Sequence, residues 1–410
     1  MFPPFLIALA AFAAKVPSWD SFVSQLPPEP KLDPAVTVKF YRDAQGINPN
    51  CQQVWMALEC KEIPYETILV DESPELISDA TVPRVEWPTG EVTENSLEIL
   101  EEIQKRYNED NGYPLDLYKR VSVSVDNVRC SLMRTPGVFQ RKTDMEHYQN
   151  VCLAPYLFTP EGTLTNRNQH MVTLEEIDEC LEEYDDGPFI CGDFVSAADM
   201  VWGPWLERLQ ATLPMVLEGE TAQPRSGAYE EIQAWYRAME QEVPAYSCRV
   251  GGDSVSWQRL LTKAVHDQSI PSRPKDLALL PPRGMQTPST QTQKKAESIW
   301  KSYSATRPHV AASPAAECVA VLVRQRAQFQ SLLEQSLPSL TPNELDEAYR
   351  EVLAALLDEN TDYDELSGSA RDVAASLDEA VQSPRDMGML PAVSLRALVK
   401  AAPAPRIQLL

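Results

Sequence analysis

The side chains in this chain that are best suited to chemistry lie at the starts of two expected helices. One helix begins at Asn48-Pro49 and carries Cys51 one turn in, and the other begins at Ser96. A hydroxyl group and the free N–H groups of a first helical turn together form an anion site, so Ser96 is a candidate for holding a carboxylate. A helix N-terminus also favours the thiolate form of a nearby cysteine. Asparagine followed by proline is equally a common helix start that needs no ligand to explain it.

The elements that must position these residues alternate between strands and helices. Val36 to Tyr41 alternates apolar and polar residues, as a half-buried strand does. Apolar residues at helical spacing predict helices at Cys51–Lys61 and Asn95–Tyr107. Between these helices the sequence predicts a strand at Tyr65–Val70 and a hairpin formed by Val82–Trp87 and Glu91–Thr93, with its turn at Thr89-Gly90.

From about Tyr113 onward the pattern becomes helical. Ser196 and Asp199 form an S-x-x-D helix start, in which each side chain satisfies a free amide of the first turn, and Val195 is placed as a hydrophobic staple. The carboxylate-rich stretch Glu175–Asp186 could be mistaken for a set of catalytic acids. Apolar residues recur in it every three or four positions, however, which makes its acidic side the solvated face of a helix.

The last part of the chain divides into a proline-rich segment and further helices. Between Ile270 and Pro314 there are many prolines, serines and threonines and few apolar residues, which predicts a linker. Helices then begin at Ser313-Pro314 and at the capping box Thr341–Glu344, and two more are expected further on. Each of these helices has one apolar face, so this part must pack on itself, on the main body or on a partner.

The composition excludes some classes of site. The chain has 60 acidic and 36 basic residues, a formal net charge of -24 and no basic stripe, so it does not suit nucleic acid. Its eight cysteines show no disulfide framework, which favours a reduced compartment. The sequence has no C-x-x-C pair, H-E-x-x-H motif or zinc-type Cys/His cluster, so no metal site is expected.

The N-terminus carries a short apolar run, Phe5–Ala14. The run is too short to span a bilayer. Ala11-Phe12-Ala13 is similar to a signal cleavage site, but no basic residue precedes the run. Two interpretations stay open, which are a targeting segment with plastid or secretory routing and an apolar arm that lies on the folded body.

From Val36 to Val250 the chain resembles a glutathione transferase. The resemblance depends on several features in the family's order and spacing: the first strand-helix unit, Val82-Pro83, Ser96, the run G-D-F-V-S-A-A-D and the closing W-Y-R-A-M-E-Q-E-V-P-A-Y. It implies an α/β thioredoxin-like domain followed by an all-α C-terminal domain, and the chain adds a helical extension. The runs Y-R-D-A-Q-G and P-R-D-M-G-M-L-P are most similar to long glutathione transferase-like proteins of photosynthetic protists.

The expected domain boundaries follow from this resemblance and from composition. They are an N-terminal arm or targeting segment at 1–34, a thioredoxin-like glutathione-binding domain at 35–110, an all-helical domain at 111–255, a proline-rich linker at 256–314 and a helical extension at 315–410.

The resemblance implies a glutathione site made of Val82, Pro83, Asn95 and Ser96. Pro83 matches the family's cis-proline, and the backbone N–H and C=O of Val82 would meet the cysteinyl part of glutathione. Ser96 matches the serine that meets the γ-glutamyl carboxylate. Asn95 stands where relatives usually carry an acidic residue for the amino group of glutathione, and an amide supplies no charge there. Without a ligand, Val82-Pro83 is an ordinary tight turn and Ser96 a simple helix cap.

At the first helix, one residue departs from the family's thiol-transferase pattern and another matches it. Asn48 stands where such members carry their nucleophilic cysteine, and Cys51 stands at the second cysteine position. Asparagine cannot attack or form a mixed disulfide, but it can donate an N–H to the sulfur of glutathione and favour its thiolate. Asn48 is therefore either an activating residue or only a helix cap. Cys51 is either a redox thiol or a buried structural residue.

The expected activity is conjugation, in which the thiolate of glutathione, the cosubstrate, attacks a small electrophile and Asn48 stabilises the thiolate. The alternatives are a non-catalytic glutathione transferase-like binding or scaffold protein and a thiol redox protein that uses Cys51. The absent cysteine, the amide at Asn95 and the long C-terminal extension favour the scaffold. By resemblance we expect a cytoplasmic detoxification enzyme that forms a homodimer and has no membrane span.

Overall fold

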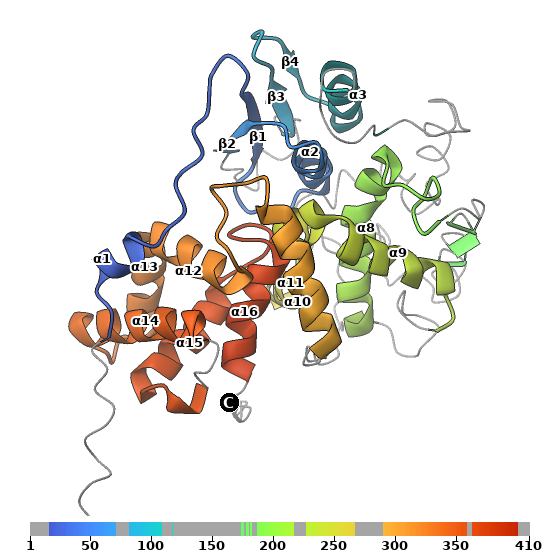
Figure 1. Ribbon diagram of the computed structural model, residues 1–410. Coiled ribbons are helices and arrows are strands. Elements are labelled where there is room, and N and C mark those ends of the chain that lie inside the picture. The colour runs from blue at the N-terminus through green and yellow to red at the C-terminus, as the bar shows by residue number, and fades with distance from the viewer. Residues whose placement is uncertain are drawn as a thin grey trace, which may run out of the picture. The chain divides into compact units, whose positions relative to one another are not determined.

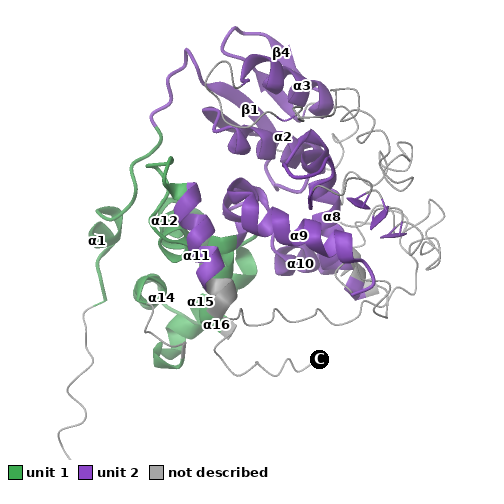
Figure 2. Cartoon of the chain, turned by 45° about the vertical axis from the view of Figure 1, so that its right-hand side comes forward, with its two compact units in different colours: residues 1–30, 304–382, 390–410 green, residues 31–303, 383–389 purple. Residues whose placement is uncertain are grey.

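The fold is seen in a computed structural model that describes residues 16–70, 82–108, 117, 174–175, 178–179, 181–182, 187–216, 227–266, 290–358 and 363–400. The chain forms two compact units (Figure 2). Unit 1 contains residues 1–30, 304–382 and 390–410, and unit 2 contains residues 31–303 and 383–389. The apolar run Phe5–Ala14 and most of the acidic stretch Glu175–Asp186 lie outside the described residues.

Unit 2 contains a four-stranded mixed sheet with the strand order β2-β1-β3-β4 (Figure 1). Its strands are β1 (Val38–Asp43), β2 (Tyr65–Val70), β3 (Arg84–Glu86) and β4 (Val92–Thr93). Strand β2 is parallel to β1, whereas β3 is antiparallel to both β1 and β4. Val38 and Phe40 alternate with polar residues, so both side chains point into the core and are fully buried. The predicted strands and hairpin are confirmed, although the first strand begins at Val38 rather than Val36.

Two helices complete the thioredoxin-like domain. Helix α2 (Pro49–Cys60) and helix α3 (Ser96–Arg106) pack against each other and share one apolar core with the sheet. Most of the apolar residues that predicted these helices from their spacing are buried in this core: Val54, Trp55 and Leu58 on α2, and Leu100 and Ile103 on α3. Leu97, which was expected on the same face of α3, is exposed instead. The strand-helix-strand unit followed by a hairpin and a helix is the α/β plan expected from the sequence.

The other described elements of unit 2 are helical. They are α8 (Ala197–Val216), α9 (Glu230–Glu242), the π-helical turn η3 (Tyr246–Val250), α10 (Ser254–His266) and α11 (Thr290–Ser304). Helix α8 packs against both α2 and α10. Tryptophan side chains fill much of this interior, namely Trp202, Trp205, Trp235 and Trp257. The expected all-α domain is thus observed.

Two helices occupy part of the segment predicted as a linker, 256–314. Within it, most of α10 and the whole of α11 are helical, and Leu261 and Trp300 are buried. Tyr303 at the end of α11 donates a hydrogen bond to Glu59 of α2 at 3.0 Å, and Tyr65 of β2 donates to the same carboxylate. Composition alone suggested a linker because prolines dominated the segment and masked the few apolar residues at helical spacing. Residues 267–289 lie outside the described part of the chain.

Unit 1 is built from helices of the C-terminal extension and one short N-terminal helix. They are α1 (Trp19–Val23), α12 (Pro314–Arg324), α13 (Arg326–Ser336), α14 (Pro342–Leu357), the 3-10 turn η4 (Tyr363–Glu365), α15 (Gly368–Ala380) and α16 (Met389–Lys400), of which Met389 itself belongs to unit 2. Helix α14 packs against α15 and α12. Trp19 of α1 donates a hydrogen bond to Asp346 of α14 at 2.7 Å. The apolar faces predicted for this region therefore pack on one another.

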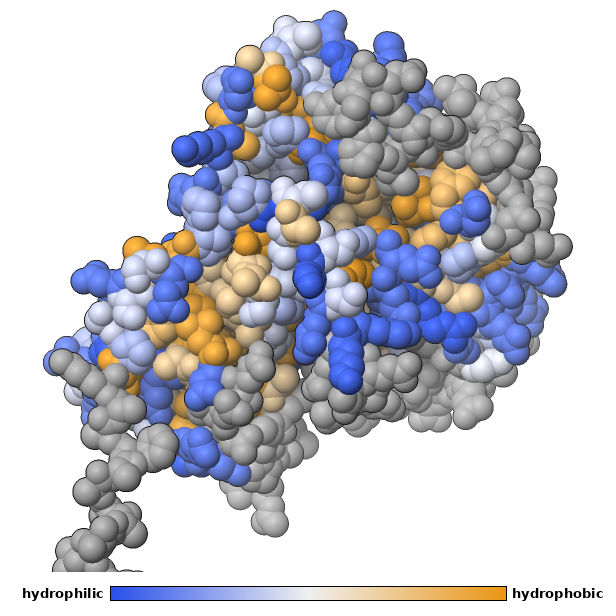
Figure 3. Space-filling view, viewed as in Figure 1, coloured by the Kyte–Doolittle hydropathy of each residue, from blue (hydrophilic) through white to orange (hydrophobic). Residues whose placement is uncertain are grey.

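The surface of the described residues carries hydrophilic side chains with apolar ones among them (Figure 3). Exposed apolar side chains come from separate elements, for example Val23 of α1, Leu69 of β2 and Leu97 of α3. Among the helices in the described ranges, none combines the length and the apolar character that crossing a membrane requires.

Candidate functional site

The strand register brings three segments with candidate site residues to one end of the sheet. Tyr41 pairs with Arg84, and Val85 pairs with Thr93, so β1 and β4 both run opposite to β3. The residues after β1, before β3 and after β4 therefore share one end. Asn48 follows β1, Val82-Pro83 precedes β3, and Asn95-Ser96 follows β4. Neighbouring strands lie about 4.8 Å apart, so the three segments span roughly 10 Å.

Asn48 is the N-cap of α2. Its Oδ1 accepts hydrogen bonds from the N–H of Asn50 at 2.9 Å and of Cys51 at 3.3 Å, and Pro49 follows as the first helical residue. Asp43 Oδ2 accepts from the N–H of Ile47 at 2.7 Å and of Asn48 at 3.3 Å, which fixes the turn before the helix. Since Oδ1 is used in capping, the Nδ2 group of this half-buried side chain is what remains to donate to a ligand.

Cys51 is enclosed by the first turn of α2. Its exposed fraction is 2 %, and its backbone N–H donates to the Asn48 cap. The nucleophilic form of a cysteine is an accessible thiolate, which burial opposes. The structure thus places Cys51 beside Asn48, as the sequence spacing requires, but in the core rather than at a surface.

Val82 and Pro83 begin the segment that leads into β3. Their peptide bond is cis, as the resemblance implies, and both residues are buried. The ladder between β1 and β3 stops at the Tyr41–Arg84 pair, one residue short of Pro83. Among the described residues, neither the N–H nor the C=O of Val82 has a hydrogen-bond partner. Buried backbone groups are nearly always paired, so this peptide edge is open to a ligand or to water.

The start of α3 differs in one respect from the sequence interpretation. The N-cap is Asn95, whose Oδ1 accepts from the N–H of Leu97 at 2.9 Å and of Glu98 at 3.3 Å. Ser96 is the first helical residue and is half-buried, so the interpretation of Ser96 as a simple cap is wrong. The oxygen of Asn95 expected to accept from an ammonium group already serves two amides. Its Nδ2 group and the Ser96 hydroxyl both suit a carboxylate instead.

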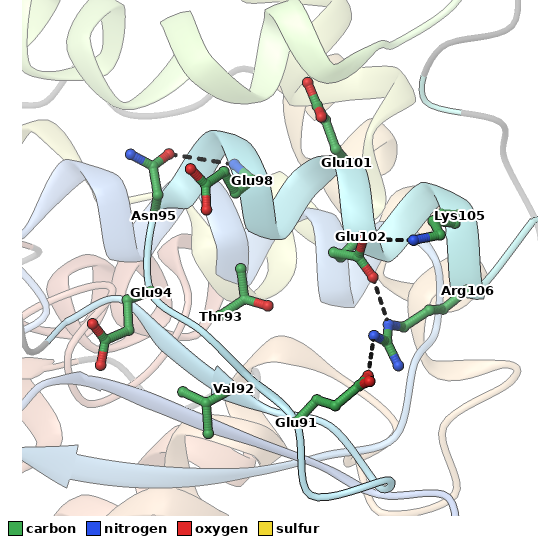
Figure 4. A pocket seen from close by; sticks show the side chains of 10 residues that line it. All are labelled: Glu91, Val92, Thr93, Glu94, Asn95, Glu98, Glu101, Glu102, Lys105 and Arg106. Carbon is green, nitrogen blue, oxygen red and sulfur yellow. Dashed lines mark hydrogen bonds and ion pairs between the residues drawn. The ribbon is translucent and has the colours of Figure 1, made fainter.

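An open groove of about 780 Å³ lies beside this helix start, between β4 and α3 (Figure 4). It is lined by Glu91, Val92, Thr93, Glu94, Asn95, Glu98, Glu101, Glu102, Lys105 and Arg106. Arg106 is paired with Glu91 and Glu102, and Lys105 is paired with Glu102. Of the predicted site residues only Asn95 lines it, and its five carboxylates would repel an anionic peptide. The groove is therefore not the predicted glutathione site.

A buried polar network connects α2 to α8 directly behind Asn48. Glu207 of α8 is fully buried, and its Oε1 accepts from Gln52 Nε2 at 3.0 Å, Trp257 Nε1 at 2.9 Å and the N–H of Gly252 at 2.9 Å. Burial raises the pKa of Glu207 above its ordinary value, while the adjacent Arg208 lowers it. The carboxylate is thus held by donors from three separate elements.

Arg208, the next residue on α8, holds the turn that carries Asn48. Its Nη1 donates to Gln52 Oε1 at 2.7 Å, and its Nη2 donates to the carbonyl of Ile47 at 3.0 Å. Its guanidinium also lies 4.0 Å from the centre of the Trp257 ring. Sequence analysis missed Gln52, Glu207 and Arg208. The available signal was the presence of polar residues inside otherwise apolar helices, which indicates that they have partners in the core.

The helix start at Ser196–Asp199 has reciprocal hydrogen bonds. Asp199 Oδ2 accepts from the Ser196 N–H at 2.8 Å and from the Ser196 hydroxyl at 3.0 Å, and Ser196 Oγ accepts from the Ala198 N–H. Asp199 Oδ1 accepts from Ile190 N–H and Trp235 Nε1, both at 2.9 Å. Burial raises the pKa of Asp199 above its ordinary value, and the hydrogen bonds that it accepts offset part of this increase. All of its contacts are internal, so this pair stabilises the fold.

No group of metal-ligating side chains occurs among the described residues. The candidate site residues at one end of the sheet offer amide, hydroxyl and backbone groups.

Comparison with protein families gives two matches. Residues 48–106 match the glutathione S-transferase N-terminal domain, and residues 165–238 match the glutathione S-transferase C-terminal domain. No curated protein sequence matches the chain.

Solved structures of glutathione transferases share features with the chain at low identity. Glutathione transferase Omega 3C from Trametes versicolor is 16% identical, with 61% of this chain and 96% of that chain covered and a TM-score of 0.38. A glutathione S-transferase from Methylobacillus flagellatus KT, solved with GSH bound, is 19% identical, with 50% and 95% covered and a TM-score of 0.36. The trimeric Leishmania glutathione transferase TDR1 is 16% identical, with 57% and 49% covered and a TM-score of 0.43. The family assignment rests on the two domain matches, not on these scores.

Proposed function

Because residues 48–106 and 165–238 are the N-terminal and C-terminal domains of a glutathione S-transferase, we propose that this protein binds glutathione and transfers it to small electrophiles. The observation that carries the proposal is the shared end of the sheet, where Asn48, Val82 and Ser96 come from three adjacent segments. An extended tripeptide is about 10 Å long, which is close to the width of three strands.

The γ-glutamyl carboxylate, the cysteinyl backbone and the sulfur of glutathione each have a chemically suitable group in this arrangement. The γ-glutamyl carboxylate lies at the start of α3, where the Ser96 hydroxyl and the positive end of the helix dipole favour an anion. The cysteinyl backbone meets the N–H and C=O of Val82, which have no hydrogen-bond partner among the described residues, in the manner of a short added strand. The sulfur then lies at the start of α2, near Asn48.

The proposed reaction needs only a sulfur nucleophile. Asn48 Nδ2 donates to the sulfur, which lowers the pKa of the thiol because the hydrogen bond favours the charged form. The thiol proton leaves to solvent, the thiolate attacks the electrophilic carbon, a C–S bond forms, and the leaving group departs with its bonding pair. A neutral amide is a weaker stabiliser than a cation, so a modest shift of the thiol pKa is expected.

A glutathione titration tests this proposal. Isothermal calorimetry on the full chain is expected to show binding of glutathione, and a spectroscopic assay with a chlorinated aromatic electrophile is expected to show conjugation above the rate without enzyme. An absence of binding heat at millimolar glutathione would sink the proposal. Binding without conjugation would support the second candidate, a non-catalytic glutathione-binding protein, which the use of Asn48 as an ordinary helix cap favours.

The redox alternative has less support. A thiol redox protein needs an accessible nucleophilic sulfur, and Cys51 is 2 % exposed. Labelling of the native protein with a thiol reagent is expected to leave Cys51 unmodified. The cytoplasmic location, the role in detoxification, the homodimer and the domain boundaries 35–110 and 111–255 stay predictions from the resemblance.

A further inference from the structure

A seven-residue segment of the C-terminal extension belongs to the same unit as the candidate site. Residues 383–389 are part of unit 2, whereas the residues before and after them are part of unit 1. Ser383, at the start of the segment, is buried and exchanges two hydrogen bonds with Asp253. Asp253 N–H donates to Ser383 Oγ at 2.7 Å, and Ser383 Oγ donates to Asp253 Oδ2 at 2.6 Å. The Ser383 N–H also donates to Ser256 Oγ at 3.0 Å.

The other end of the segment approaches the backbone of η3 so closely that only glycine fits. A Cβ atom on Gly388 would lie 1.9 Å from the carbonyl oxygen of Cys248. Cys248 is a buried residue of η3, and its carbonyl belongs to the backbone, so it cannot rotate out of the way. Met389, the next residue, packs against the core of unit 2. The segment is therefore fixed at both ends.

The middle of the segment contacts the turn that precedes Asn48. A Cβ atom on Gly46 would lie 3.0 Å from Arg385 Cα and 3.1 Å from Arg385 N. Gly46 has a positive φ of 67°, which glycine adopts without strain. Two internal anchors hold the same turn, namely Asp43 Oδ2 on the N–H groups of Ile47 and Asn48 and Arg208 on the Ile47 carbonyl. The Arg385 backbone is a third anchor, and it comes from far along the chain.

We propose that the segment Ser383–Met389 is a positioning element that holds the turn Gly46–Asn48 in the geometry required for the glutathione sulfur. It fixes the direction in which the Asn48 amide points, because the backbone of the turn is packed between Asp43, Arg208 and Arg385. The part of this inference that concerns glutathione rests on the proposed function. The part that concerns the turn does not, and the two are tested by different measurements.

The first measurement is amide hydrogen exchange on the full chain, with Gly388→Ala as the variant. The added methyl group forces the segment away from η3, so the amides of residues 43–50 are expected to exchange at least about fivefold faster than in the wild type. Gly368→Ala is the matched control, since a Cβ atom there meets nothing within 4 Å. It is expected to leave this exchange unchanged, and α9 is expected to keep its protection in both variants.

Unchanged exchange at residues 43–50 in Gly388→Ala would overturn the proposal, whether or not the amides near η3 become less protected. If Gly388→Ala does not fold, Ser383→Ala replaces it, because it removes only the hydroxyl that binds Asp253. The same faster exchange of residues 43–50 is expected, and its absence would be equally decisive.

The second measurement is glutathione affinity by calorimetry. In the variant that folds, the dissociation constant for glutathione is expected to rise about fivefold or more, since misplacement of the turn weakens one set of ligand contacts. The amides of α9 are expected to keep their wild-type protection from exchange. A wild type that does not bind glutathione would remove the proposed function, yet the exchange result would still decide whether the segment holds the turn. Wild-type affinity in a variant with faster exchange would show that the turn's geometry does not matter for the ligand, and would overturn that half of the proposal.

Discussion

The starts of helices α8 and α2 use the same capping chemistry in opposite surroundings. At α8, Ser196 and Asp199 are fully buried, and Asp199 accepts four hydrogen bonds, all from within unit 2. At α2, Asn48 is half-buried, and its cap uses the amide oxygen alone. A saturated, enclosed cap stabilises the fold. A cap that has access to the surface, and a donor group with no partner among the described residues, can also bind a ligand.

The start of α3 is intermediate between these two helix starts, because its capping residue and its proposed ligand-binding residue are different. Asn95 makes the capping bonds, and Ser96 follows it as a half-buried first residue. In the proposed function, capping falls to Asn95 and ligand binding to Ser96, whereas at α2 one residue would have to do both.

The largest effect is expected at the enclosed cap. Asp199→Ala leaves the donors of Ile190, Ser196 and Trp235 buried without an acceptor, and should lower the free energy of unfolding by about 3–5 kcal/mol. Urea unfolding followed by tryptophan fluorescence measures it. The control is Thr341→Ala at the exposed capping box of α14, where a loss of about 1 kcal/mol is expected. Equal losses at the two caps would contradict the comparison.

The network behind α2 should give the second-largest effect. Arg208→Met removes the hydrogen bonds that Arg208 donates to Gln52 Oε1 and to the Ile47 carbonyl, and it leaves buried Glu207 without its positive neighbour. The free energy of unfolding should fall by about 3 kcal/mol. Chemical denaturation measures this loss. Arg324→Met is the control, because this arginine makes an exposed hydrogen bond to the Pro27 carbonyl and its loss should change stability by less than about 0.5 kcal/mol. A small effect at Arg208 would mean that the network does not hold the turn.

Asn48→Asp separates the two roles proposed for the α2 cap. Aspartate caps a helix as well as asparagine does, so the free energy of unfolding should stay within about 0.5 kcal/mol of the wild type. It cannot donate to sulfur and places a negative charge near a thiolate, so conjugation should fall about tenfold or more. Steady-state conjugation rates check this, with Asn50→Asp as the neighbouring control that is not a cap. Equal rates for wild type and Asn48→Asp would reduce Asn48 to a cap.

The smallest effect is expected at α3, where the roles are already divided. Ser96→Ala should weaken glutathione binding about fivefold, which corresponds to the net loss of one hydrogen bond, with almost no change in stability. Asn95→Ala should instead lower stability by about 1 kcal/mol through loss of the cap. Calorimetry and thermal unfolding of both variants give the two numbers. A stability loss at Ser96 equal to that at Asn95 would show that the division does not exist.

The elements of the sheet domain could be predicted because each one leaves a local pattern. Strand alternation at Val38–Phe40, the Thr89-Gly90 turn and the Asn48-Pro49 helix start each depend on residues a few positions apart. The cap of α3 was misassigned by one residue, since Asn95 and Ser96 are both good capping residues and helix boundaries are the least certain feature of such patterns.

The contacts that position the site could not be predicted in this way. Gln52 meets Glu207 and Arg208 across more than 150 positions of sequence, and Gly46 meets Arg385 across more than 300. Such contacts depend on how whole elements pack. The type of one residue, together with its sequence neighbours, does not indicate which distant residue it contacts. The same holds for α11, whose few apolar residues become informative only when the core that receives them is known.

The hydrogen bond from Tyr303 to Glu59 has a practical consequence for anyone who expresses this protein in pieces. A recombinant fragment that ends at residue 255, the expected end of the all-helical domain, would lack most of α10, all of α11 and the segment Ser383–Met389. It would lack Trp257 and so expose the residues that pack around this side chain. Glu59 would lose the hydrogen bond from Tyr303 and keep the one from Tyr65. The smallest fragment that keeps all of unit 2 therefore has to reach Met389.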